Sequence, residues 1–234
     1  MKKICVLLVV CLLGVAAQAG PVGLIDDFSG DLSAYTSTVI LDTDPGGGAN
    51  TSAWQITGET LELNTTVYQS IEQYAMIYGG LSLAVGEEVQ IDITHSGASQ
   101  DIGLYVGGTT PTYNVRQDYI AMYSRGDGDV FTRGFDGTSE YGLIGDWGNP
   151  AHDKLFIART AVNTFEAGYY DGATRTVLGT RTPTYANEAD VVGFYADVRG
   201  AGVLGNLDNL TIIPEPATIA LLGLGGLALL RRKR

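Results

Sequence analysis

Carboxylates are the most abundant side chains in this sequence that could do chemistry, with 26 acidic residues against 14 basic ones. Glycoside hydrolysis, for example, uses two carboxylates that flank the scissile bond. Glu88 and Asp92 are separated by four positions within Glu88–Thr94, a segment that strictly alternates polar and apolar residues. Because alternate side chains of a strand share a face, we expect both acids on one face. The pattern favours the solvent face of a strand over a catalytic pair.

Histidine and serine offer little further chemistry. The two histidines, His95 and His152, show no metal-ligand spacing, and no Gly-x-Ser-x-Gly pattern marks a nucleophile. A Ser-His-Asp triad is spatial, so short motifs do not exclude one. We predict no catalytic residue and expect a protein that is not an enzyme.

Calcium is a more plausible ligand, because it binds carboxylate, amide and carbonyl oxygens. Oxygen-bearing side chains occur in one Asp-Gly-Asp turn and near both ends of the central region. The candidate ligands are Asp26, Asp27, Asp127, Asp129, Asp208 and Asn209. We expect a structural Ca²⁺ and no other cofactor.

Trp147 lies in a loop-like stretch between Asp146 and Asn149. An exposed indole can stack on a sugar while the neighbouring polar groups bond its hydroxyls, so these three residues form a candidate glycan site. The alternative is that Trp147 packs over the end of the fold. Trp54 alternates with Ile56, which predicts a core position.

The elements that would position these residues are short strands. Segments rich in Val, Ile, Tyr, Phe and Thr suit a pleated sheet. They are Trp54–Ile56, Leu61–Leu63, Glu88–Thr94, Asp118–Ser124, Lys154–Arg159, Thr164–Tyr170, Thr174–Thr180 and Asp190–Val198. Asp-Gly pairs such as Asp136-Gly137 and Asp171-Gly172 favour type I′ hairpins. The pattern predicts an all-β protein made of a two-sheet antiparallel β-sandwich.

The N-terminus has the layout of a secretory signal peptide. Two lysines precede an apolar stretch from Ile4 to Ala17, and Ala17 and Ala19 supply the small-x-small cleavage pattern. We expect a signal peptide at 1–19, removed by signal peptidase. The central region 20–213 is expected to form one domain.

The C-terminus has three parts. Pro214, Glu215 and Pro216 precede an uncharged apolar run, Ala217–Leu230, which is expected to form a short hydrophobic helix that enters the membrane. A basic cluster follows and is expected to stay on the cytoplasmic side: Arg231, Arg232, Lys233 and Arg234. This tail at 214–234 resembles the PEP-CTERM sorting signal of Gram-negative bacteria. The resemblance implies an exosortase that removes the tail; an ordinary membrane anchor is the alternative.

Charge and cysteine content exclude several classes. Outside the two ends, eight basic and 25 acidic residues remain, a net charge of −17 against −12 for the whole chain. Such a body repels nucleic acid. Both cysteines, Cys5 and Cys11, lie in the leader. The body therefore has no disulfide and no thiolate metal site.

The borders of the body carry a second resemblance. The opening Ile25–Leu32 and the closing Gly205–Ile212 resemble those of concanavalin A-like, laminin G-like jelly rolls. The resemblance implies that the first and last strands lie close together. Laminarinase-type members carry Glu-x-Asp-x-x-Glu on one strand, and this sequence has no such motif.

These observations predict an exported protein of the cell surface or extracellular matrix, held transiently in the inner membrane by its tail. We expect a non-catalytic module that contacts extracellular polysaccharide. The alternatives are a glycan-active hydrolase or lyase on the same scaffold and a purely structural matrix protein.

Overall fold

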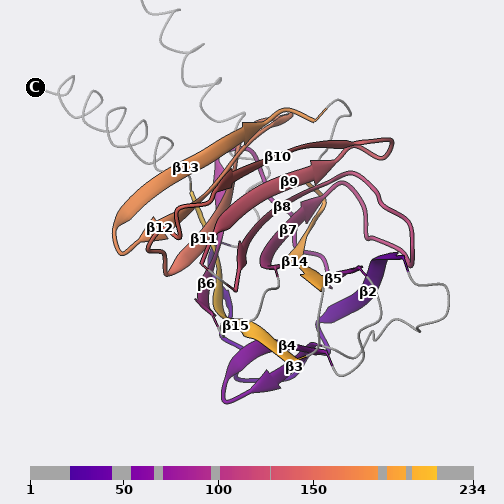
Figure 1. Cartoon of the computed structure of the whole chain (residues 1–234), viewed down its shortest axis with the longest axis vertical. Coiled ribbons are helices and arrows are strands. Elements are labelled where there is room, and N and C mark those ends of the chain that lie inside the picture. Colours follow the sequence, from indigo (N-terminus) through magenta and orange to yellow (C-terminus); the bar gives the residue numbers. More distant parts are fainter. Residues whose placement is uncertain are drawn as a thin grey trace, which may run out of the picture.

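Two antiparallel sheets face one another in the computed structural model of the chain (Figure 1). The structure describes residues 22–43, 54–65, 71–95, 101–126, 128–183, 189–198 and 202–214. The eight-stranded sheet runs in the order β13 (Thr174–Arg181), β12 (Thr164–Asp171), β11 (Lys154–Ala161), β6 (Glu87–His95), β15 (Gly202–Pro214), β4 (Thr60–Thr65) and β3 (Trp54–Thr57), and β1 (Gly23–Asp26) also pairs with β15. The seven-stranded sheet runs in the order β10 (Glu140–Asp146), β9 (Val130–Phe135), β8 (Tyr119–Arg125), β7 (Asp101–Gly107), β14 (Val191–Val198), β5 (Glu72–Tyr78) and β2 (Tyr35–Asp42). The predicted all-β sandwich is confirmed.

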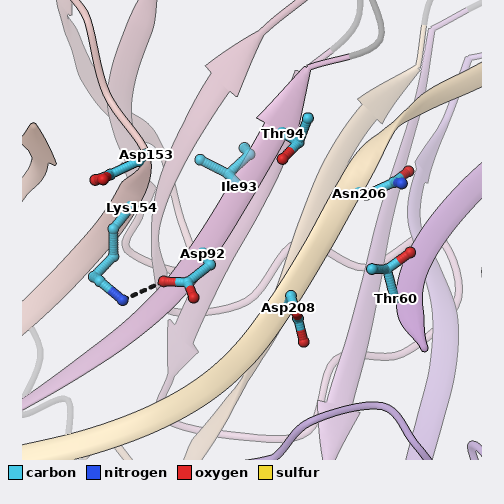
Figure 2. A pocket seen from close by; sticks show the side chains of 8 residues that line it. All are labelled: Thr60, Asp92, Ile93, Thr94, Asp153, Lys154, Asn206 and Asp208. Carbon is cyan, nitrogen blue, oxygen red and sulfur yellow. Dashed lines mark hydrogen bonds and ion pairs between the residues drawn. The ribbon is translucent and has the colours of Figure 1, made fainter. Parts of the chain in front are cut away.

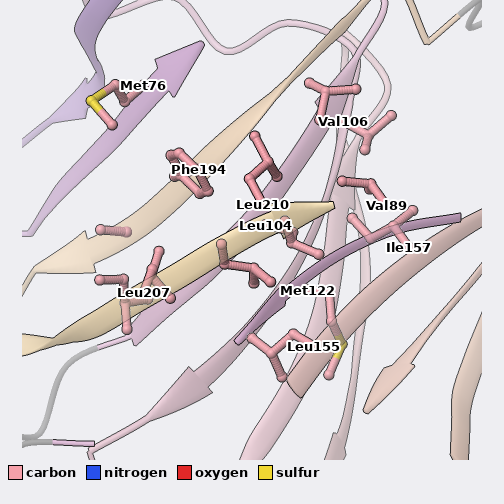
Figure 3. Close-up of a cluster of buried hydrophobic side chains, with 14 of the residues drawn as sticks. Met76, Val89, Leu104, Val106, Met122, Leu155, Ile157, Phe194, Leu207 and Leu210 are labelled. Carbon is pink, nitrogen blue, oxygen red and sulfur yellow. The ribbon is translucent and has the colours of Figure 1, made fainter. Parts of the chain in front are cut away.

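The core lies between the sheets, where alternate residues of the facing strands meet (Figure 3). Val89, Ile91 and Ile93 of β6 point inward, as their alternation predicted. Phe194 of β14 contributes from the other sheet and packs against Trp54, with ring centroids 6.2 Å apart. Trp54 is therefore a core residue, as expected.

The last strand, β15, joins the two ends of the body. It pairs with β6 along its length, from Gly205 opposite His95 to Pro214 opposite Glu87. On its other edge, β4 pairs with the first half and β1 with the second half. The predicted proximity of the first and last strands is confirmed. A bulge interrupts the ladder after Asp208, where Asn209 adopts a φ of 53°.

The hairpin turns differ from the expectation. At Asp136-Gly137 and Asp171-Gly172 only the glycine has a positive φ, so these turns are not type I′. The β3–β4 turn has the type I′ signature instead, because Gly58 (60°) and Glu59 (64°) both adopt positive φ. In the β12–β13 hairpin Asp171 pairs with Thr174. Gly172 is therefore the first central residue rather than the second, which is the position that a type II′ turn requires of glycine.

No helix among the described residues is long and apolar enough to cross a membrane. The signal peptide with Ala17 and Ala19, and the tail from Glu215 through Arg234, lie outside the described residues. Pro214 is described, as the last residue of β15.

Candidate functional site

Trp147 lies at the corner where β10 ends, and its side chain is 63% exposed. Its ring forms a T-shaped contact with Phe131 of β9, with centroids 4.5 Å apart and planes inclined at 72°. The Arg125 guanidinium lies 4.5 Å from the Phe131 centroid and 5.7 Å from the Trp147 centroid. The indole is thus supported from below and open to solvent.

The loop that carries Trp147 is held by polar contacts from both sheets. Asp146 accepts hydrogen bonds from Gly148 N (3.0 Å) and from the Tyr169 hydroxyl of β12 (3.3 Å). Asn149 N donates to Asp129 Oδ1 (3.1 Å). The amide of Asn149 lies against Gly128, where an added Cβ would stand 1.8 Å from Asn149 Oδ1. Asp146, Trp147 and Asn149 therefore form one ordered corner, which we call the Trp147 corner.

A row of aromatic rings leads from this corner across the outer face of the seven-stranded sheet. Phe131 contacts Tyr123 (centroids 5.6 Å apart), and Tyr123 contacts Tyr195 (5.4 Å). Tyr195 contacts Tyr119 (6.0 Å). These four rings are almost wholly buried, and burial raises the pKa of Tyr119 to about 12. The row is a rigid support for the corner rather than an open surface.

Charged side chains cover part of this row. Arg133 donates to Asp197 Oδ2 (3.1 Å) and to the Tyr195 hydroxyl (3.2 Å), and it also pairs with Glu140. Gln73 donates to the same Asp197 oxygen (3.0 Å). The outer face is therefore a closed polar and aromatic layer over the sheet.

A serine and a histidine meet below the corner. Ser124 Oγ lies 2.7 Å from His152 Nε2, while His152 Nδ1 donates to the Pro150 carbonyl (2.7 Å). Ser124 is fully buried, and the third group is a carbonyl rather than a carboxylate. This arrangement stiffens the loop beside Trp147 and differs from a Ser-His-Asp triad.

Two carboxylates that the sequence did not single out lie beside the β8–β9 pair. Tyr119 at the start of β8 pairs with Phe135 at the end of β9, so Asp118 and Asp136 lie just beyond this last pair of the ladder. Burial, aided by the charge of Asp136, raises the pKa of Asp118. Asp118 Oδ1 is buried without a hydrogen-bond partner among the described residues.

The outer face of the eight-stranded sheet carries a polar hollow of about 490 Å³ (Figure 2). Asp92, Asp208 and Lys154 line it, and Lys154 forms an ion pair with Asp92. Asp92 also accepts a hydrogen bond from the Asn209 amide (2.9 Å). Asp92 is half-buried rather than fully solvated.

The expectation that Glu88 faces solvent is wrong. Its side chain is on the outer face, as the alternation predicted, but it is completely buried. It accepts hydrogen bonds from Arg175 Nε (2.9 Å) and the Tyr170 hydroxyl (2.6 Å). The Arg175 guanidinium also lies 4.1 Å from the Phe156 centroid. Long side chains of β12 and β13 fold over the glutamate and remove it from water.

The five candidate calcium ligands that the structure describes do not lie in one site. Asp26 and Asp27 accept hydrogen bonds from their own turns, at Phe28 N (2.7 Å) and Ser29 N (3.1 Å). Asp208 accepts from Asn209 N (2.7 Å), whereas Asp129 belongs to the other sheet. Asp127 lies outside the described residues. Within the described ranges, no group of three or more His, Cys, Asp or Glu side chains is placed to hold a metal ion.

Comparison with known proteins supports two parts of this description. Residues 213–234 match the PEP-CTERM protein-sorting motif, which indicates export and sorting to the cell surface in Gram-negative bacteria. No curated protein sequence matches the chain.

Solved structures share the fold. A Bacillus subtilis protein of unknown function with a galectin-like fold has a TM-score of 0.54 at 9% identity, covering 84% of this chain and 97% of its own. The Bacillus licheniformis β-glucanase has a TM-score of 0.53 at 14% identity, covering 83% and 98%. The exoplasmic/lumenal domain of VIP36, bound to Ca²⁺ and Man3GlcNAc, has a TM-score of 0.52 at 10% identity, covering 82% and 87%. At these identities the likeness shows a jelly-roll fold alone.

Proposed function

We propose that the body is a non-catalytic glycan-binding module of an exported surface protein, and that the Trp147 corner is its binding site. The observation that carries this proposal is the solvent-open indole of Trp147 held in a T-shaped contact with Phe131. A partly exposed indole offers a flat apolar surface with a polar N–H, and a pyranose offers an apolar face of similar size.

The surroundings of the ring favour sugar hydroxyls as further partners. Asp146 and Asn149 flank the indole and are fixed by backbone hydrogen bonds, so little conformational entropy is lost when a ligand binds. The body carries a net charge of −17, which disfavours polyanionic chains. We therefore propose a neutral polysaccharide as the ligand.

The test is binding of the purified protein to neutral polysaccharides, with the affinities of wild type and variants measured by isothermal titration calorimetry and tryptophan fluorescence added for the wild type. Trp54 is buried in the core, so a ligand-dependent change reports on Trp147. We expect Trp147→Ala to weaken binding by roughly 30-fold, equivalent to about 2 kcal/mol for an aromatic hot spot. Tyr113→Ala is the matched control, because Tyr113 is also an exposed aromatic residue but lies beside β2. Equal affinity of wild type and Trp147→Ala would refute the proposed site.

The alternative function is a glycan-active enzyme, and one observation favours it. Asp118 and Asp136 are opposed, and the raised pKa of Asp118 is a property of general acids. The discriminating assay is reducing-sugar release from the same polysaccharides. Release that disappears in Asp118→Asn would overturn the non-catalytic proposal, whereas binding without release supports it.

We also propose that the tail holds the exported chain in the inner membrane until exosortase removes it. The apolar run Ala217–Leu230 and the basic cluster after it support this step. Cells lacking the exosortase should retain the tail on the membrane-associated protein. An unchanged product in such cells would favour an ordinary anchor.

A further inference from the structure

We propose that the end of the sandwich from which the tail leaves is a lipid-facing rim that lies on the bilayer while the chain is anchored. This inference rests on the proposed anchoring by the tail and is independent of glycan binding. The rim consists of Val22, the segment 84–86 and the segment 161–163.

Strand pairing places these segments side by side. Pro214 at the end of β15 pairs with Glu87 at the start of β6, directly after segment 84–86. Gly86 N donates to the Arg159 carbonyl (2.7 Å) near the end of β11, which leads into segment 161–163. On the other side of β15, Gly23 pairs with Ile212, so Val22 is at the same end. Four neighbouring strands at about 4.8 Å spacing give a rim roughly 15 Å long.

The rim is apolar and solvent-exposed. Val22, Val85 and Val162 are 51%, 49% and 61% exposed. The other residues of segments 84–86 and 161–163 are Ala, Gly and Asn, so these segments carry no charge in a body with 25 acidic residues. Beside the rim, Leu24 and Leu81 line a hollow of about 330 Å³. Isolated exposed valines are ordinary, but their convergence at one end indicates an interaction surface.

One buried arginine holds the two exposed turns in place. Arg159 donates from Nη1 to the Leu83 carbonyl (2.9 Å) and from Nη2 to the Val162 carbonyl (2.9 Å). The Arg159 guanidinium is therefore engaged in hydrogen bonds inside the rim. These bonds hold the backbone of the two turns that expose Val85 and Val162 to solvent. The rim is preformed rather than dependent on a change of conformation.

The length of the connecting chain identifies the bilayer as the occupant. Only Glu215 and Pro216 separate the last described residue, Pro214, from the apolar run that starts at Ala217. Three extended residue steps span about 10 Å at most. If the run enters the bilayer, the rim must lie within about that distance of the lipid surface. An uncharged, valine-bearing rim suits the interfacial region, where a highly acidic surface would be repelled by anionic headgroups.

The same geometry orients the proposed glycan site. The strand β11 runs from Lys154 to Ala161, and the Trp147 corner precedes its first residue. Tyr169, which bonds Asp146, pairs with Leu155 at that far end. A strand of this length spans about 23 Å. With the rim on the membrane, Trp147 lies at the end of the sandwich that faces away from the membrane.

The test is site-directed fluorescence quenching on the exported form of the chain, residues 20–234, which contains no cysteine once the expected signal peptide is removed. A polarity-sensitive dye is attached at Val162→Cys, and the chain is added to phosphatidylethanolamine/phosphatidylglycerol vesicles that contain nitroxide-labelled lipid. Ala173→Cys is the matched control, since it lies in the exposed turn at the other end of β12. Val85→Cys repeats the measurement from a second turn.

We expect the dye at Val162 and at Val85 to be quenched at least about two-fold more than the dye at Ala173. Co-sedimentation with the vesicles is measured on the same samples. A chain that co-sediments with equal quenching at all three positions refutes the rim while leaving the anchor intact. A chain that does not co-sediment refutes both the anchoring and the rim. Neither result bears on glycan binding at Trp147.

Discussion

Removal of the Asp197 carboxylate should destabilise the body strongly, because this carboxylate forms a buried ion pair with the Arg133 guanidinium. The Asp197 side chain is fully buried and accepts hydrogen bonds from Arg133 Nη1 (3.1 Å) and Gln73 Nε2 (3.0 Å). Asp197→Ala leaves two buried donors without this acceptor. Breaking a buried ion pair from one side costs about 3–5 kcal/mol. Arg133 keeps Glu140 as a partner, so we expect the lower end, about 3 kcal/mol.

The matched control removes the other, more exposed partner of the same arginine. Glu140→Gln should cost no more than about 1 kcal/mol, because its side chain is 35% exposed and solvent screens the pair. The double variant Asp197→Ala with Arg133→Met removes both buried charges and should recover most of the loss.

The assay is urea unfolding at pH 7, followed by tryptophan fluorescence. With a slope of about 2 kcal/mol per molar urea, a loss of 3 kcal/mol lowers the midpoint by about 1.5 M. If Asp197→Ala costs no more than Glu140→Gln, the reasoning from burial is wrong. A double variant that is less stable than Asp197→Ala alone would also contradict it.

Three further changes test the outer face and the sheets. The pKa of Tyr119 is raised to about 12, so the folded protein should lose stability as the pH rises from 10 towards 12; titration at 295 nm should show its ionisation delayed until then. The pKa of Asp118 is raised by burial, so its contribution to stability is present below pH 3.8 and is lost as the pH rises. Asp118→Asn should therefore stabilise the protein at pH 7 but not below pH 3.8, and thermal melts at both pH values check this. Gly168→Ala would place a Cβ 2.0 Å from the Thr176 carbonyl, and chemical unfolding should show a loss of about 1–3 kcal/mol. A wild-type melting temperature for Gly168→Ala would contradict the close approach of β12 and β13.

Prediction from the sequence succeeded where one face of a strand is buried and the other is polar. The segment Glu88–Thr94 became β6. The buried segments Lys154–Arg159 in β11 and Asp190–Val198, which covers β14, were predicted from their β-branched and aromatic residues instead. The strands β5 and β7 were missed because almost every residue of Glu72–Tyr78 and Asp101–Gly107 is buried. A strand covered on both faces loses the alternation that marks it, and a short buried run does not differ from a helix segment by periodicity.

The candidate site was predictable only in part. The polar neighbours of Trp147 are adjacent in sequence, so local composition sufficed to propose a sugar site there. Its support comes from Phe131 and Arg125, which lie on other strands. The opposition of Asp118 and Asp136 likewise depends on the pairing register of β8 and β9, which no local pattern reveals.

The sequence by itself determined the C-terminal sorting motif, the all-β class and the inward face of each alternating strand. These features depend on local composition and on a period of two, both of which are visible along the chain. Tertiary structure alone decided what lies over each outward face. Glu88 is on the face that alternation assigns but is buried by Arg175, which is 87 residues away in the sequence. The rim at the tail likewise exists because residues 22, 85, 162 and 214 meet at one end of adjacent strands. Which residues are buried, and which lie next to one another, depends on the pairing of strands and on the way in which long side chains cross neighbouring strands. These features therefore follow from packing rather than from local pattern.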